Sequence, residues 1–99
     1  MTNFEGHIQG DKPVLVDFYA DWCGPCKLMA PVLQEVKQKI GDRATILKLD
    51  IEKAPEFAER YKVRAIPTLI IFKNGNIIWR KSGVSSAHEI MNGLAGHIT

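Results

Sequence analysis

The two cysteines of the chain, Cys23 and Cys26, stand three positions apart and enclose a Gly-Pro pair. An apolar run over residues 14–19 precedes them and is typical of a strand buried on both faces. After them, apolar residues recur at helical spacing, at Leu28, Val32, Val36 and Ile40. Cys23 is therefore expected at a helix N-terminus, where unpaired N–H groups and the helix dipole favour a thiolate. This placement lowers the pKa of Cys23 below the free value of about 8.5 and indicates redox chemistry.

The two thiols are expected to have different tasks. Cys23, at the mouth of the helix, is predicted to be the exposed, attacking sulfur, and Cys26, further into the helix, the shielded, resolving one. Attack gives a mixed disulfide, from which the second thiol displaces the reduced product. A histidine between the cysteines would over-stabilise the thiolate and give an oxidant. Gly24 and Pro25 stand there instead, which favours a reductant over an oxidase or isomerase.

Two other uses of a close cysteine pair compete with redox catalysis. A structural zinc site needs four ligands, commonly two such pairs or one pair with histidines at helical spacing. The three histidines, His7, His88 and His97, are scattered over different predicted elements, so we expect no metal site. An inert disulfide is disfavoured because so small a loop constrains the unfolded chain little.

Composition places the chain among ordinary globular proteins. Its 99 residues suit a single domain, residues 1–99, with 45% hydrophobic and 24% charged residues. The net charge of +2, without a basic cluster, argues against nucleic acid or an anionic membrane as a partner. The first residues lack the pattern of a signal peptide. We expect a cytoplasmic monomer, although a leader removed earlier would leave no trace.

The first half of the chain predicts a short helix, a strand, a long helix and a second strand. The short helix lies within residues 1–10 and is capped by Asn3. The strand covers residues 14–19, and the long helix runs from about Cys23 to Ile40 with a kink at Pro31 and an end at Gly41. The second strand covers residues 44–50. This strand–helix–strand order implies a right-handed parallel crossover.

The second half predicts a short helix, a hairpin and a last helix. The short helix covers about residues 55–61. Strands over 68–73 and 76–82 flank Asn74-Gly75, the signature of a type I′ turn. Ser86 and Glu89 predict a capping box for a helix to about Ile98, weakened by two glycines. Trp79 is interpreted as a structural residue.

Asp17 is anomalous in a strand otherwise buried on both faces. It is either a surface aspartate on a sheet edge or a buried carboxylate. Burial without a partner is costly for a carboxylate, so the pKa of a buried Asp17 is expected to rise. Such a group can accept the proton of Cys26, through water, as that thiol attacks the mixed disulfide.

The motif around the cysteines resembles thioredoxin. The resemblance rests on the residues 21–27 (Asp-Trp-Cys-Gly-Pro-Cys-Lys), on Asp17, on Ile66-Pro67-Thr68, on residues 72–75 and on Gly83. It covers about residue 13 to the C-terminus. It implies an α/β thioredoxin fold with a central mixed sheet and helices on both faces. Two departures stand out. The N-terminal arm is too short for the usual additional strand, which leaves four strands and the second one as a possible edge, and Tyr19 replaces a second tryptophan.

The resemblance also implies roles for residues outside the cysteine motif. It assigns Asp17 as the proton acceptor and Lys48 as its charge partner, although Lys48 also suits a solvated strand lysine. It implies a cis peptide before Pro67 that faces the cysteines and offers the backbone of Ile66 to substrate, where a merely structural proline is the alternative. An apolar docking surface is then expected to ring the site, formed by Trp22, Gly24, Pro25, Ala65, Ile66, Gly83 and Val84. Trp22 also suits plain core packing.

The function that the resemblance implies is the reduction of protein disulfides. The chain is expected to bind no cofactor, to act on disulfide-containing target proteins and to be recharged by a flavin- and NADPH-dependent thioredoxin reductase. Two alternatives remain open from the residues. One is a binding module with incidental redox activity, and the other is a zinc protein using the cysteine pair.

Overall fold

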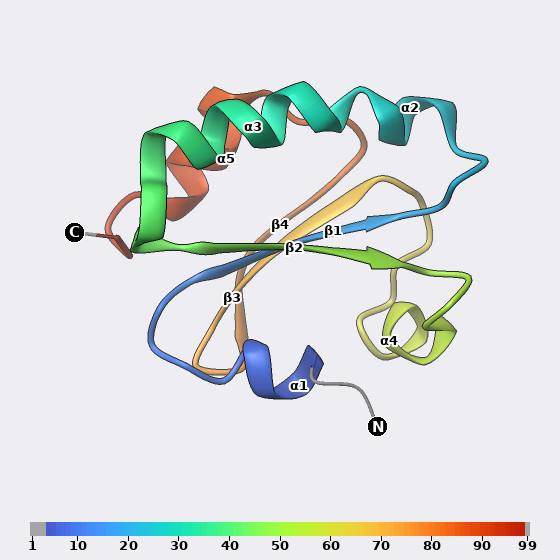
Figure 1. Ribbon diagram of the computed structural model, residues 1–99. Helices are drawn as coiled ribbons and strands as arrows, with labels where there is room; N and C mark the ends of the chain where they lie inside the picture. The colour runs from blue at the N-terminus through green and yellow to red at the C-terminus, as the bar shows by residue number, and fades with distance from the viewer. Residues whose placement is uncertain (1–3, 99) are drawn as a thin grey trace.

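The centre of the molecule is a four-stranded sheet in the order β2-β1-β3-β4 (Figure 1). The computed structural model describes residues 4–98. The strands are β1 (Val14–Tyr19), β2 (Thr45–Asp50), β3 (Thr68–Lys73) and β4 (Asn76–Ser82). β1 pairs with β2 in parallel and with β3 antiparallel, and β3 pairs with β4 antiparallel. The mixed four-stranded sheet predicted from the sequence is confirmed.

Helices cover both faces of this sheet, as expected (Figure 1). One face carries α3 (Met29–Ile40) and α5 (Ala87–Leu94), and the other carries α1 (Phe4–His7) and α4 (Pro55–Arg60). Side chains of β1 alternate between two cores, because successive strand residues point to opposite faces. Leu15 packs with α3 and α5, whereas Val16 and Phe18 pack with Phe57 of α4.

The long helix predicted from Cys23 to Ile40 is divided in two. α2 (Gly24–Lys27) ends at Lys27 with Leu28 as its C-cap, and α3 begins at Met29. Pro31 lacks the N–H that would bond to the carbonyl of Lys27, and its ring crowds that carbonyl. The N–H of Leu28 donates to the carbonyl of Pro25, three positions back, at 3.1 Å and closes the last turn of α2. The prediction of a single kinked helix was therefore wrong, because the proline breaks the bonding one turn before its own position.

Residues 4–13 form no strand, so β2 lies at an edge of the sheet. The cap predicted at Asn3 falls outside the described residues. The segment after α1 is held against the β3–β4 hairpin by backbone bonds. The N–H of Asn74 donates to the carbonyl of Gly10 and that of Gly75 to the carbonyl of Ile8, both at 2.7 Å. Positive φ at both turn residues, 55° and 80°, confirms the type I′ turn.

The last helix begins as predicted and ends early. Ser86 and Glu89 form the capping box. α5 stops at Leu94 rather than near Ile98, and the left-handed φ of 86° at Gly96 turns the chain away. Gly93 within the helix has a packing role, since a Cβ there would lie 2.7 Å from the ring of Trp79. Trp79 in turn packs against the core under α3 and α5, which confirms its structural role.

Candidate active site

The sulfur of Cys23 caps the N-terminus of α2. Cys23 has extended backbone angles, and its Sγ accepts a hydrogen bond from the backbone N–H of Cys26 at 3.1 Å. The chain reaches this point from the end of β1. Pro25 suits the first turn of α2, because the N–H that proline lacks would have no partner within the helix there. The two cysteines are joined in a disulfide, with their Cα atoms 5.3 Å apart. Their three-residue spacing on one helical turn makes this closure possible.

Both cysteines are buried in the disulfide form. The exposed fractions are 4% for Cys23 and 7% for Cys26 in this form. The expected contrast between an exposed and a shielded thiol concerns the reduced protein and stays a prediction. Both pack with Ala20 and against the half-buried Tyr19, Ile51 and Ile66. What distinguishes the sulfurs is electrostatic: Cys23 faces the helix N-terminus and receives an N–H, which stabilises negative charge on sulfur.

The loop before β3 faces the cysteines through Ile66. The peptide bond between Ile66 and Pro67 is cis, as the resemblance implied. The carbonyl oxygen of Ile66 lies 3.8 Å from Cys23 Sγ. The Thr68 hydroxyl donates to the carbonyl of Ala65 at 2.5 Å, and the N–H of Gly83 donates to the carbonyl of Pro67 at 2.7 Å. These bonds fix the loop beside the disulfide.

Most residues predicted to form the docking surface are exposed. Trp22 is 66% exposed and Val84 is 41% exposed, while Gly24, Pro25 and Ala65 are exposed as well. The indole N–H of Trp22 donates to Glu52 Oε2 at 2.7 Å, so the ring is anchored without being buried. The core-packing interpretation of Trp22 is therefore wrong.

Asp17 is a buried carboxyl group at the centre of the sheet. It is 1% exposed, and its Oδ1 has no hydrogen-bond partner among residues 4–98, so the surface interpretation is wrong. Burial raises the pKa of Asp17 from 3.8 to about 6, while the charge of Lys48 opposes this rise. The parallel register sets Asp17 directly opposite Lys48.

Lys48 is exposed, as a solvated lysine would be, yet its ammonium group is held near the site. Its Nζ lies 4.6 Å from the centroid of the Tyr19 ring, a cation–π contact. Lys48, Tyr19 and Cys26 line one small pocket of about 200 Å³. The structure thus places the predicted charge partner and the predicted resolving cysteine at the same opening.

Two residues that the sequence did not single out as site residues contribute to this arrangement. Glu52 anchors Trp22 from the turn after β2, and Tyr19 holds the ammonium group of Lys48. No local pattern marks Glu52, since its partner is 30 residues away. For Tyr19, the signal available was its position two residues after Asp17, on the same face of the strand.

Residues 4–98 contain no group of three or more His, Cys, Asp or Glu side chains that could hold a metal ion. Within the same range, no helix is both long and apolar enough to cross a bilayer.

Comparison with known proteins agrees with this geometry. The family model described as Thioredoxin matches residues 1–96. This chain belongs to the thioredoxin family. Thioredoxins are protein dithiol–disulfide oxidoreductases, and the Cys23–Cys26 disulfide of this chain has the form that such activity requires.

Individual thioredoxins show how far the similarity extends. The chain is 45% identical over 94 residues to the thioredoxin of Alicyclobacillus acidocaldarius subsp. acidocaldarius, covering 95% of this chain and 90% of that protein. It is 51% identical over 83 residues to the chloroplastic thioredoxin Y of Oryza sativa subsp. japonica, covering 84% of this chain but 49% of that protein. The chain therefore spans about half the length of this plant thioredoxin.

Proposed function

We propose that this protein reduces disulfide bonds of other proteins. The observation that carries the proposal is the hydrogen bond from the Cys26 N–H to the sulfur of Cys23 at the start of α2. In the reduced protein, the Cys23 thiolate attacks one substrate sulfur and forms a mixed disulfide, releasing the other as a thiolate. Cys26 then attacks Cys23 Sγ, which restores the Cys23–Cys26 disulfide and frees the second substrate thiol. Two electrons pass from the protein to the substrate.

Asp17 serves the second step in this proposal. The thiol of Cys26 must lose its proton to attack, and a carboxylate with a pKa of about 6 is ionised at neutral pH and able to accept it. The proposed transfer runs through water. Cys26 lines a small pocket together with Lys48, and Lys48 lies opposite Asp17 in the parallel register. The ammonium group of Lys48 keeps part of the Asp17 population ionised, because its charge lowers the pKa of the carboxyl.

Substrate is held, in the same proposal, by the exposed apolar rim and by the backbone of Ile66. The carbonyl of Ile66 is 3.8 Å from the attacking sulfur, so an extended segment bonded there brings its own disulfide close to Cys23. Trp22, Pro25 and Val84 supply apolar area around it.

The reductant that restores the dithiol is proposed to be a flavin- and NADPH-dependent thioredoxin reductase, so the chain itself needs no bound cofactor. The compartment proposed is the cytoplasm, where thiols are kept reduced. Similar proteins named as chloroplastic make the plastid the alternative that cell fractionation with a specific antibody would distinguish.

Insulin reduction in the presence of NADPH and a thioredoxin reductase tests the activity. The intact protein should turn over many equivalents of insulin, and Cys23→Ser should be inactive. Cys26→Ser should also fail to turn over but should accumulate stable mixed disulfides with reduced insulin chains. Mixed disulfides on Cys23→Ser and not on Cys26→Ser would reverse the assigned roles. An intact protein that binds insulin without reducing it would be a binding module.

A further inference from the structure

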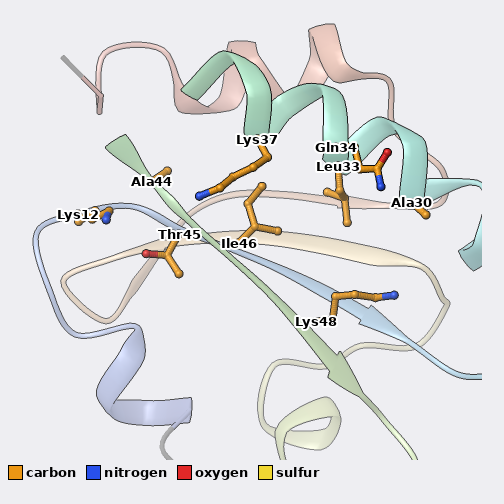
Figure 2. A pocket seen from close by; sticks show the side chains of 9 residues that line it. All are labelled: Lys12, Ala30, Leu33, Gln34, Lys37, Ala44, Thr45, Ile46 and Lys48. Atoms are coloured by element: carbon orange, nitrogen blue, oxygen red, sulfur yellow. The ribbon is translucent and has the colours of Figure 1, made fainter. Parts of the chain in front are cut away.

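The outer edge of β2 and the space between it and α3 form a groove, and Lys48 is the one lining residue that the proposed redox chemistry also uses (Figure 2). It has a volume of about 490 Å³. We call it the β2 groove, and it is lined by Lys12, Ala30, Leu33, Gln34, Lys37, Ala44, Thr45, Ile46 and Lys48.

The backbone of β2 is open on the side that borders this groove. The N–H of Thr45 donates to the carbonyl of Pro13 and that of Ile51 to the carbonyl of Tyr19, both at 2.9 Å. Because strand residues alternate, the backbone groups of Ile46 and Lys48 point away from β1. β2 has β1 as its one strand neighbour among residues 4–98. An extended segment can therefore pair with this edge.

The side chains around the groove combine an apolar floor with positive ends. The half-buried Ile46 supplies apolar surface, and the buried Leu33 and Ala44 lie beneath it as lining residues. All the charged lining residues are lysines, although the whole chain has 11 acidic against 13 basic residues. No salt bridge within residues 4–98 involves one of these lysines, although the charge of Lys48 also acts on the buried Asp17. Lys12 lies beside the start of β2, next to Thr45, and Lys48 lies three residues further along the strand, a rise of about 10 Å.

We propose that the β2 groove binds an extended segment of a partner protein in which two acidic side chains flank an apolar one on the same face. Alternate residues of a strand share a face and are about 6.6 Å apart. A sequence of the type acidic-x-apolar-x-acidic is thus long enough to reach from Lys12 to Lys48. Its apolar side chain then lies over Leu33 and Ile46.

A second copy of the chain suits this edge less well than an acidic segment. Pairing of β2 with β2 of another copy would bring the lysines of the two grooves together, and like charges on paired strands are destabilising. An acidic segment meets the same lysines with opposite charge.

The groove adjoins the redox site without overlapping its substrate face. Ala30 and Lys48 line both the groove and the small pocket beside Cys26. A partner held at β2 would therefore be tethered next to the cysteine pair while Trp22 and Val84 stay accessible. The binding itself requires no redox activity, so it is tested on the oxidised protein.

The probe is the peptide Glu-Thr-Val-Thr-Glu, acetylated and amidated, titrated into the oxidised protein and followed by amide NMR. We expect saturable binding, with the largest shifts at Ile46 and Lys48. Lys12→Glu combined with Lys37→Glu should weaken binding about tenfold or more. Lys39→Glu is the control for charge reversal, because Lys39 lies in the same last turn of α3, is exposed and does not line the groove, although it gives up the ion pair with Glu35.

Lys37 Nζ also donates to the carbonyl of Gly41 at 3.2 Å, so Lys37→Gln with Lys12→Gln serves as a milder pair if the charge reversals impair folding. A peptide N-methylated at its valine should lose binding, since it cannot complete the strand pairing. Absence of saturable binding, or binding that survives the lysine changes or N-methylation, would overturn the proposal. A concentration-dependent dimer with protected amides at Ile46 and Lys48 would replace it with self-association.

Discussion

Asp17 is an ionisable residue in the buried centre of the sheet, where burial favours the neutral form of its carboxyl group. Its pKa of about 6 in the folded protein exceeds the unfolded value near 3.8. Below the unfolded pKa the carboxyl is protonated in both states and costs nothing. The penalty grows as the pH rises and is complete above the folded pKa, at about 3 kcal/mol.

Asp17→Asn should therefore gain stability relative to the wild type as the pH rises, by about 2 kcal/mol between pH 4 and pH 8. Urea unfolding of both oxidised proteins at the two pH values measures this difference. Asp17→Asn should also slow insulin reduction, because the proton acceptor for the Cys26 thiol is lost. Stability curves that stay parallel from pH 4 to pH 8 would mean that Asp17 ionises as freely in the folded protein as in the unfolded one.

Lys48→Gln should raise the pKa of Asp17 further, because the charge of Lys48 is what lowers it. The carboxyl carbon chemical shift of Asp17, followed against pH, gives this pKa directly. Lys53→Gln is a suitable control, since Lys53 is an exposed lysine in the turn that follows β2. An unchanged midpoint in Lys48→Gln would remove Lys48 from the electrostatics of the site.

At the scale of elements, α5 contains Gly93, a residue of low helix propensity that leaves room for the ring of Trp79. Gly93→Ala should improve the propensity by about 1 kcal/mol but force a methyl group against the ring of Trp79. We expect a net loss of about 1–2 kcal/mol in the free energy of unfolding, measured by urea denaturation.

Gly6→Ala provides the matched control for this substitution. Gly6 also lies in a helix, α1, and a Cβ there meets no atom within 4 Å. It should be neutral or slightly stabilising. If Gly93→Ala were as well tolerated as Gly6→Ala, the packing between β4 and α5 would have to be looser than the contact with Trp79 indicates.

At the scale of the whole molecule, Phe4 connects the first described element to the second core. Its ring centroid lies 4.6 Å from that of Phe57, 6.1 Å from that of Tyr61 and 6.0 Å from that of Phe72. Glu5 beside it pairs with Arg60 of α4. Contacts with α4 and β3 thus fasten the N-terminal segment without a strand.

Phe4→Ala should lower the free energy of unfolding by about 3 kcal/mol, the usual cost of removing a buried aromatic side chain. His7→Ala, at an exposed position of the same short helix, should change it little. Both are measured by urea unfolding of the oxidised protein. Equal, small effects would show that α1 contributes no anchoring.

The sequence by itself determined the features of this protein that depend on residues close together in the chain. The type I′ turn at Asn74-Gly75 needs positive φ at two adjacent positions, and the capping box needs Ser86 and Glu89 three positions apart. The position of Cys23 before a helix follows from the strand and helix patterns around it. The resemblance to thioredoxin added the cis peptide at Pro67, which no local pattern specified.

The tertiary structure decided what depends on residues distant in the chain. The burial of both cysteines comes from packing against Ile51 and Ile66, which lie far beyond the helix that carries them. The groove exists because β2 has no outer neighbour in residues 4–98, and sheet order is set by long-range pairing. The break at Leu28 was missed because the predicted apolar spacing ran across it, from Leu28 to Ile40. Leu28 is 59% exposed, and the buried stripe of α3 is formed by Met29, Leu33, Val36 and Ile40.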